Sequence, residues 1–502
     1  MRLSKHSSWT VLIALGTGLA ACEAGDTAEE PAERTGSARS ALGQPLGSET
    51  EPNGVAVDAD PIPNDTVVRA DIYPAGDSDY FSFQAAAGSR VYAAVASAFS
   101  ANTSTDADLQ IIASDGTTVL EYDDLNGSLG GLAPSIAGTT LPTDGTYYVR
   151  AFHFNPASLL TPYDLHFKVQ QGLPTPEQEP NDMTPQPLPA SGWITGNLSA
   201  VTDVDVYSIS LQAGDTVFAS LDLDPTRDGT EFNGVLSMAP FSGTAVQVND
   251  GGGAGPDSEA LFTTVNTTGT FGIGVSGAAA GDYMLSVSVH PAAPSTGCTT
   301  YTSTDVPKVI PTGPGQVTSV INVPSSVRAG DVDVSLQLNH ASPLDVDAHL
   351  ISPAGNTNGL FTDIGSATLP SIATRIDDEA AVTISSFPNV NGTSVQPENV
   401  YRLSWLDGEN PAGTWTLVLD DDTANNGGTL SGWSITICDQ PVPAVTCSGG
   451  NPPTTAFSTG FEAGAAVRAS PTPGPPMSGR SAPPPRLPSP RATAGHSASR
   501  PT

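Results

Sequence analysis

Apolar and polar residues alternate in short runs along most of the chain, as they do in β-strands that turn one face toward a core. Residues 79–83, 217–221 and 332–338 show this alternation. After the N-terminus, no long stretch has helical periodicity. The chain contains 51 Gly and 45 Pro residues, which are typical of the turns between such runs. The pattern predicts an all-β protein of antiparallel strands joined by tight turns.

An internal repeat divides the first part of the chain. The 502 residues are enough for about three to four domains of ordinary size. Five blocks occur twice in the same order, so each copy is expected to form an antiparallel β-sandwich. The paired blocks are Glu51-Pro52-Asn53 with Glu179-Pro180-Asn181, 76–83 with 201–209, 87–89 with 213–215, 145–149 with 269–273, and 163–169 with 283–289.

The order Glu-Pro-Asn, Asp-x-Asp, Ala-Gly and Gly-x-aromatic resembles the bacterial pre-peptidase C-terminal (PPC) domain, over residues 49–170 and again over 177–290. The resemblance implies jelly-roll-like sandwiches that accompany secreted proteases and other hydrolases. Such domains are often removed after export, and some related domains bind insoluble polymers. Two Asp pairs, Asp77 with Asp79 and Asp203 with Asp205, are expected either to cap turns or to help bind calcium.

Residues 298–439 form a third predicted module. It contains a His…Asp…Leu-x-Ser-Pro-x-Gly block at 340–355, Asp378-Glu379-Ala380, and a closing pattern with Trp415 and Trp433. These motifs resemble the proprotein convertase P domain. The resemblance implies a β-sandwich that assists a subtilisin-like protease, although bacterial members also occur on metalloproteases and on surface proteins without a protease. Both tryptophans are expected in the core.

Calcium is commonly bound in that family, and it needs six to eight oxygen ligands from loops. The expected structural calcium ligands lie at strand ends within the matched blocks. They are Asp345, Asp347, Asp378, Asp420 and Asp422. The alternative for residues 420–422 is a solvated turn.

The N-terminus predicts export. Arg2 and Lys5 precede an apolar run, 9–21, that is too short to be a stop-transfer helix. Residues 19–22, Leu-Ala-Ala-Cys, resemble a bacterial lipobox, which implies a signal peptide over 1–21 and lipidation at Cys22. An ordinary secretory signal is the alternative. Polar residues 22–48 then predict a flexible spacer, and the expected location is the cell envelope, in an outer-membrane lipoprotein that faces the exterior or the periplasm.

The net charge of the chain limits the kinds of binding partner that can be expected. The formal net charge is −34 and the isoelectric point is about 4.1, which disfavours nucleic acid. Cys298 and Cys438 bracket the third module and predict a disulfide in an oxidising compartment, whereas Cys447 is left over.

The C-terminal segment, 440–502, changes character. It carries no acidic residue after Glu462, and it is rich in Pro and Arg. A disordered native tail and a reading-frame shift near Ala463 both explain this change.

Catalytic motifs are missing from the sequence. Among seven histidines none belongs to a His-Glu-x-x-His motif, and no Gly-x-Ser-x-Gly elbow is present. Two functions remain. One is a non-catalytic surface lipoprotein that binds calcium and a polymer or envelope protein. The other is a chain associated with serine-type proteolysis whose catalytic part is missing or acts in trans.

Overall fold

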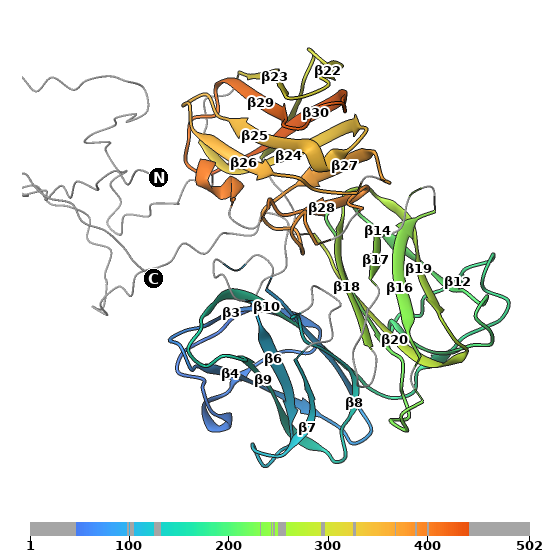
Figure 1. The fold of residues 1–502 in the computed structure, drawn as a ribbon. Coiled ribbons are helices and arrows are strands. Elements are labelled where there is room, and N and C mark those ends of the chain that lie inside the picture. Colours follow the sequence, from blue (N-terminus) through green and yellow to red (C-terminus); the bar gives the residue numbers. More distant parts are fainter. Residues whose placement is uncertain are drawn as a thin grey trace, which may run out of the picture. The chain divides into compact units, whose positions relative to one another are not determined.

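The computed structural model describes residues 47–440 apart from 98–99, 101–104, 125–131, 231, 242, 244–245, 249–257, 293–296, 325–327, 367, 387–388 and 399–400. The predicted signal peptide, Cys22, the spacer up to residue 46, Cys447 and the tail from 441 lie outside these ranges. Nearly all described elements are strands, which confirms the predicted all-β fold class (Figure 1). None of the helices in the described ranges is long and apolar enough to span a membrane.

The first sandwich contains two five-stranded sheets, with the short 3-10 helix η1 (Ala56–Asp58) at one end. One sheet has the order β1 (Gly47–Ser48), β3 (Thr66–Ile72), β10 (Leu160–Gln170), β5 (Arg90–Ala96), β8 (Ser135–Thr140). The other has the order β2 (Asp60–Pro61), β4 (Ser78–Ala85), β9 (Gly145–His153), β6 (Ala107–Ile112), β7 (Val119–Asp123).

Alternation along β4 shows why this sandwich forms. Phe81 and Phe83 are buried, while Tyr80 and Ser82 between them are partly exposed. The Phe83 ring lies 4.8 Å from the ring of Phe167 on β10, measured between centroids. Because β4 and β10 belong to different sheets, this contact lies in the core between the two sheets.

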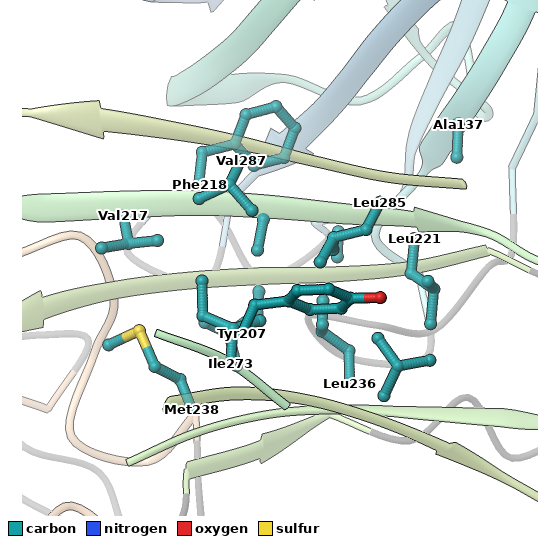
Figure 2. Packing of buried hydrophobic residues seen from close by; sticks show 14 of the residues in the cluster. Ala137, Tyr207, Val217, Phe218, Leu221, Leu236, Met238, Ile273, Leu285 and Val287 are labelled. Atoms are coloured by element: carbon teal, nitrogen blue, oxygen red, sulfur yellow. The ribbon is translucent and has the colours of Figure 1, made fainter. Parts of the chain in front are cut away.

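The second sandwich repeats the topology of the first, strand for strand. One sheet has the order β11 (Thr175–Pro176), β13 (Trp193–Leu198), β20 (Gly281–His290), β15 (Thr216–Asp222), β18 (Ser258–Val265). The other has the order β12 (Gln186–Pro187), β14 (Asp205–Leu211), β19 (Gly269–Gly277), β16 (Gly234–Pro240), β17 (Val246–Val248). Figure 2 shows Tyr207 and Leu236 of one sheet filling the core with Leu221 and Leu285 of the other.

The third sandwich pairs a four-stranded sheet with a larger one, and it carries the 3-10 helices η2 (Pro343–Asp345) and η3 (Leu403–Leu406). The smaller sheet has the order β23 (Gly315–Val323), β29 (Gly413–Asp421), β25 (Val346–Ile351), β26 (Thr357–Phe361). The larger has the order β28 (Thr393–Val395), β27 (Ser371–Ile376), β24 (Ala329–His340), β30 (Gly428–Asp439), β21 (Cys298–Thr302), and β22 (Lys308–Ile310) also pairs with β30.

Two sequence predictions for this sandwich are confirmed. Trp415 and Trp433 are buried in its core, at 0% and 3% exposure. Cys298 and Cys438 form a disulfide, and they face each other across the β21–β30 strand pair.

The second and third sandwiches share a sheet, which the sequence did not predict. Strand β18 pairs with β28 in antiparallel register, Thr264 opposite Ser394, and this pair joins their larger sheets into one of 11 strands. The Nδ2 of Asn266 donates a hydrogen bond to the carbonyl of Thr393 at 3.1 Å. The pairing covers the end of the β18 edge, at Thr264 and Val265.

Candidate functional site

An acidic pocket lies where the chain enters the first sandwich. Glu49 and Glu51 belong to the irregular segment after β1, and Asp79 occupies a buried position on β4. Oxygens of these three carboxylates all lie within 4.8 Å of one another. One oxygen of Glu49 accepts a hydrogen bond from the backbone N–H of Asp71 at 2.6 Å, and Asp79 accepts one from the hydroxyl of Tyr163 at 2.5 Å.

The second sandwich builds the same arrangement. Glu177 accepts a hydrogen bond from the backbone N–H of Asn197 at 2.8 Å, as Glu49 does from Asp71. Asp205 accepts one from the hydroxyl of Tyr283 at 2.5 Å, the counterpart of the Asp79–Tyr163 contact.

The closest group of acids differs in the second copy. Here the oxygens that lie within 4.8 Å of one another belong to Glu179, Asp182 and Asp203. The two copies therefore agree more closely in the arrangement of their strands than in which acidic residues have the closest oxygens.

Buried oxygens in both pockets lack protein partners. Asn53, Asn181, Asp79 and Asp205 are each 0% exposed. Within the described part of the chain, no hydrogen bond reaches the Oδ1 atom of any of these four side chains. Such atoms cost about 1–3 kcal/mol each when they stay unsatisfied. Carboxylate and amide oxygens are the donors that Ca²⁺ prefers, so this donor set fits a hard divalent cation.

The electrostatics of both pockets favour a cation. Burial raises the pKa of Glu49 to about 7, and burial together with the charge of Glu49 raises the pKa of Asp79 to about 9. Burial and the neighbouring Asp205 raise the pKa of Glu177 to about 7. The carboxylates are thus destabilised as anions by low solvation and by one another, and a bound cation would relieve both effects.

The two members of each predicted Asp pair make different contacts. Asp77 accepts a hydrogen bond from the next backbone N–H, and Asp203 accepts two from Ser199, as turn-capping carboxylates do, while Asp203 also belongs to the acidic group of the second copy. Asp79 and Asp205 are instead buried against tyrosines.

Sequence reasoning missed Glu49 and Glu177. A signal was available, because the full motif Glu-x-Glu-Pro-Asn occurs in both copies ahead of Asp-x-Asp.

Four of the five predicted calcium ligands of the third sandwich gather around the start of β25 and the end of β29. Asp347 and Asp420 are opposite each other in that strand pair, and the backbone N–H of Asp422 donates to the carbonyl of Asp345 at 3.1 Å. The pKa of Asp347 is raised by burial and by the charges of Asp363, Asp422 and Asp420. Asp363 is a member of this group that the sequence did not single out.

Asp378 serves a different element. Its two oxygens accept hydrogen bonds from the backbone N–H groups of Leu403 and Ser404, at 2.9 and 2.8 Å, at the start of η3. An acceptor at this position satisfies N–H groups that the helix itself leaves free. The structure therefore does not bring Asp378 together with the other four predicted ligands.

His340 is buried inside the third sandwich. Its Nε2 atom is 3.0 Å from the Oδ2 of Asp421, and both side chains are 0% exposed. Its Nδ1 is 2.6 Å from the carbonyl oxygen of Ser342. The pair links β24 to β29 in a position that solvent does not reach.

Three consecutive antiparallel sandwiches, two of them with one topology and one acidic pocket, define a modular all-β protein. Residues 77–153 match the family model of the bacterial pre-peptidase C-terminal domain, and residues 329–437 match that of the proprotein convertase P-domain. The matches confirm the two family resemblances for the first and third sandwiches. The chain therefore contains protease-associated modules.

Comparison with other proteins adds little beyond the families. No curated protein matches the chain. A periplasmic inhibitor of g-type lysozyme, PliG from Aeromonas hydrophila, is 14% identical over 22% of this chain and 96% of its own, with a TM-score of 0.17. The serine protease of Aeromonas sobria is 14% identical over 42% of this chain and 37% of its own, with a TM-score of 0.20. At such TM-scores, these likenesses carry no functional argument.

Proposed function

We propose that this chain is a non-catalytic surface lipoprotein, anchored through Cys22, whose protease-associated sandwiches bind calcium and hold a polymer or protein partner. The observation that carries the calcium part is the recurrence of one pocket. Two copies of a sandwich each place two glutamates, an asparagine and a buried Asp–Tyr pair at the point where the chain enters.

Recurrence argues for selection of the pocket's chemistry. A single buried acidic cluster can be an accident of packing, but buried unpaired carboxylates destabilise a fold. Two copies that diverged elsewhere have kept both buried aspartates, Asp79 and Asp205, and both buried asparagines, Asn53 and Asn181. A bound Ca²⁺ turns that cost into stabilisation because it supplies the missing positive charge.

Hydrogen exchange with mass spectrometry on the purified chain tests the calcium sites. We expect millimolar Ca²⁺ to slow amide exchange in residues 49–85 and 177–211 relative to the same protein in EDTA. Asp79→Asn should abolish the effect in the first range and leave the second, and Asp205→Asn should do the reverse. Each variant is therefore the other's control, and Asp58→Asn, an exposed acid of the first sandwich, controls for charge. If Ca²⁺ protects neither range, the proposal is wrong.

Anchoring needs a separate test, because Cys22 lies outside the described residues. We expect the native chain to incorporate labelled palmitate and to sediment with membranes when it is expressed in a Gram-negative host. Cys22→Ser should abolish both. If the native protein incorporates no labelled palmitate and stays fully soluble, the proposal that it is a lipoprotein is wrong.

The P-domain match supports a second candidate, an accessory of serine-type proteolysis that acts on a protease in trans. A pull-down with residues 44–440 from secreted and envelope fractions distinguishes the two, run with Ca²⁺ and then with a chelator. Capture of a protease only with Ca²⁺ favours the accessory. Capture of polysaccharide or an envelope protein without a protease favours a binding protein on the cell surface.

A further inference from the structure

The first and second sandwiches contact each other through the outer faces of two sheets. Strand β4 alternates between buried and more exposed positions, as a strand with one solvated face does. In β5 and β15, by contrast, every residue over 91–96 and 217–222 is buried. Such strands need a second layer on their outer face, beyond the core of their own sandwich.

Side-chain contacts show that each sandwich supplies this layer for the other. The hydroxyl of Tyr92 on β5 accepts a hydrogen bond from the indole N–H of Trp193 on β13 at 3.0 Å. The side-chain amide of Gln170 on β10 donates one to the hydroxyl of Ser286 on β20, also at 3.0 Å. Tyr92 and Ala137 of the first sandwich belong to the hydrophobic cluster of the second (Ala137 is labelled in Figure 2). The two sheets therefore pack directly on each other.

Charged residues also join the two sandwiches. The Nη1 of Arg90 on β5 lies 3.3 Å from a carboxylate oxygen of Asp222 on β15. Arg227 of the second sandwich pairs with Asp222 at 2.6 Å and with Glu121 on β7 of the first sandwich at 3.4 Å. The contact therefore combines ion pairs with apolar packing, as stable interfaces do.

His166 is a titratable group enclosed in the apolar part of this contact. It lies on β10, opposite Ala94 of β5, and it is 3% exposed. The centroid of its ring is 3.6 Å from that of Phe262 on β18 and 5.5 Å from that of Phe218 on β15. Among the described residues, no hydrogen bond reaches its Nδ1 atom. The imidazole is therefore held mainly by packing against two phenyl rings of the second sandwich.

The surroundings of His166 favour its neutral form. Burial lowers the pKa of His166 well below its ordinary value, and the nearby His290 and Arg69 lower it further. Two carboxylates near these groups already have cationic partners, in the pairs Asp164–Arg69 and Asp65–Lys168. Phenyl rings stabilise a cation less than water does, so a proton on His166 destabilises the closed contact.

We propose that protonation of His166 releases the first sandwich from the second, so that the contact between them is sensitive to acid. A solvated histidine binds a proton near pH 6.5, whereas the enclosed one does so only at lower pH. Below about pH 6.5, the open form gains a proton that the closed form lacks, and this favours opening by about tenfold per pH unit. Above that pH both forms are neutral, and the contact keeps its full stability.

Acids in the same contact act in the opposite direction. Burial raises the pKa of Asp222 and that of Glu121, although Arg227 lowers both. These carboxylates bind protons more readily in the closed contact than in water, so acid favours closure through them. The effect of His166 is therefore measured as the difference between the native chain and a variant without this histidine.

Hydroxyl-radical footprinting with mass spectrometry on the full chain tests the proposal, because it reads the exposure of individual side chains. Tyr92, Phe218 and Phe262 are buried and report on the contact. Phe81 and Trp415, in the cores of the first and third sandwiches, report on unfolding. EDTA is present throughout, so the result does not depend on the proposed calcium pockets.

Two variants isolate the histidine. His166→Phe fills the space between the rings without a titratable group, and His166→Gln keeps a polar side chain of similar size. Labelling of the contact reporters in the native chain, divided by that in either variant, should rise about tenfold between pH 7.5 and pH 5.5. His153→Gln removes a buried histidine on β9, in the other sheet of the first sandwich, and should respond to acid as the native chain does.

The core reporters Phe81 and Trp415 should stay unlabelled over this pH range. A ratio that does not change with pH would overturn the proposal, because acid would then act on the contact without His166. Labelling of Phe81 in step with Phe218 would also overturn it, because the first sandwich would then unfold rather than separate from the second.

Discussion

The disulfide between Cys298 and Cys438 gives the most direct quantitative prediction. It joins strands β21 and β30 and spans a sequence separation of 140 residues, which includes almost the whole third sandwich. Replacing both cysteines by alanine removes the cross-link and leaves the β21–β30 hydrogen bonds in place. The change therefore acts chiefly on the unfolded chain, which gains conformational freedom.

The loop length sets the size of the effect. The chain-entropy relation for a closed loop of about 140 residues gives about 5 kcal/mol at 25 °C. Measured effects are commonly smaller, so we expect a loss of about 3–5 kcal/mol from the third sandwich. Since whole domains are stable by only about 5–15 kcal/mol, the variant should still fold but open much more often.

Exchange of protected amides on β24 and β30, followed in low denaturant, measures this loss in the third sandwich alone. The matched control is Thr300→Ala with Thr436→Ala, which removes an exposed side-chain contact of 2.8 Å between the same two strands. This control should change the opening free energy by less than about 1 kcal/mol.

Two results would refute the reasoning. One is a loss below about 1 kcal/mol in the cysteine variant, which would mean that the unfolded sandwich keeps its ends together without the bond. The other is an equal loss in the first sandwich, which the covalent loop does not enclose.

Three substitutions of single side chains give further predictions about stability. Burial raises the pKa of Asp108 to about 6, so its carboxyl costs stability progressively as the pH rises from about 4, near its ordinary pKa, to about 6, and by a constant amount above that. In urea titrations, Asp108→Asn should therefore add about 1 kcal/mol at pH 7.5 but almost nothing below about pH 4. Trp415→Phe removes the 2.9 Å hydrogen bond to the carbonyl of Pro411 and some buried volume, so thermal unfolding should show a loss of about 2 kcal/mol. Phe81→Ala, at a fully buried site, should cost the first sandwich about 3–5 kcal/mol by urea denaturation.

Patterns in the sequence were enough to predict the features that depend on residues close together in the chain, such as the strands. The alternation that suggested strands is the alternation that buries Phe81 and Phe83, and three of the five repeated blocks contain strands that occupy the same places in the sheets of both copies. The disulfide was predictable because two cysteines bracket one module. Trp415 and Trp433 were predictable as core residues because large aromatic rings gain most from burial.

The acidic sites were less predictable, because a side chain's partners depend on which strand ends meet in space. Asp345, Asp347, Asp420 and Asp422 come together since β25 and β29 are neighbours. Asp378 lies in an equally acidic stretch, but its oxygens are used by backbone N–H groups at the start of η3. Composition does not distinguish these two situations.

Sheet edges explain the largest difference between the expected and observed architecture. The sequence predicted three separate sandwiches, yet Thr264 on β18 is opposite Ser394 on β28, from a strand of only three residues. A polar pair of this kind carries no periodic signal, and the ladder is made by backbone groups that every residue has. What the pairing requires is an open sheet edge: the backbone groups at the end of β18 pair with β28, which the third sandwich supplies.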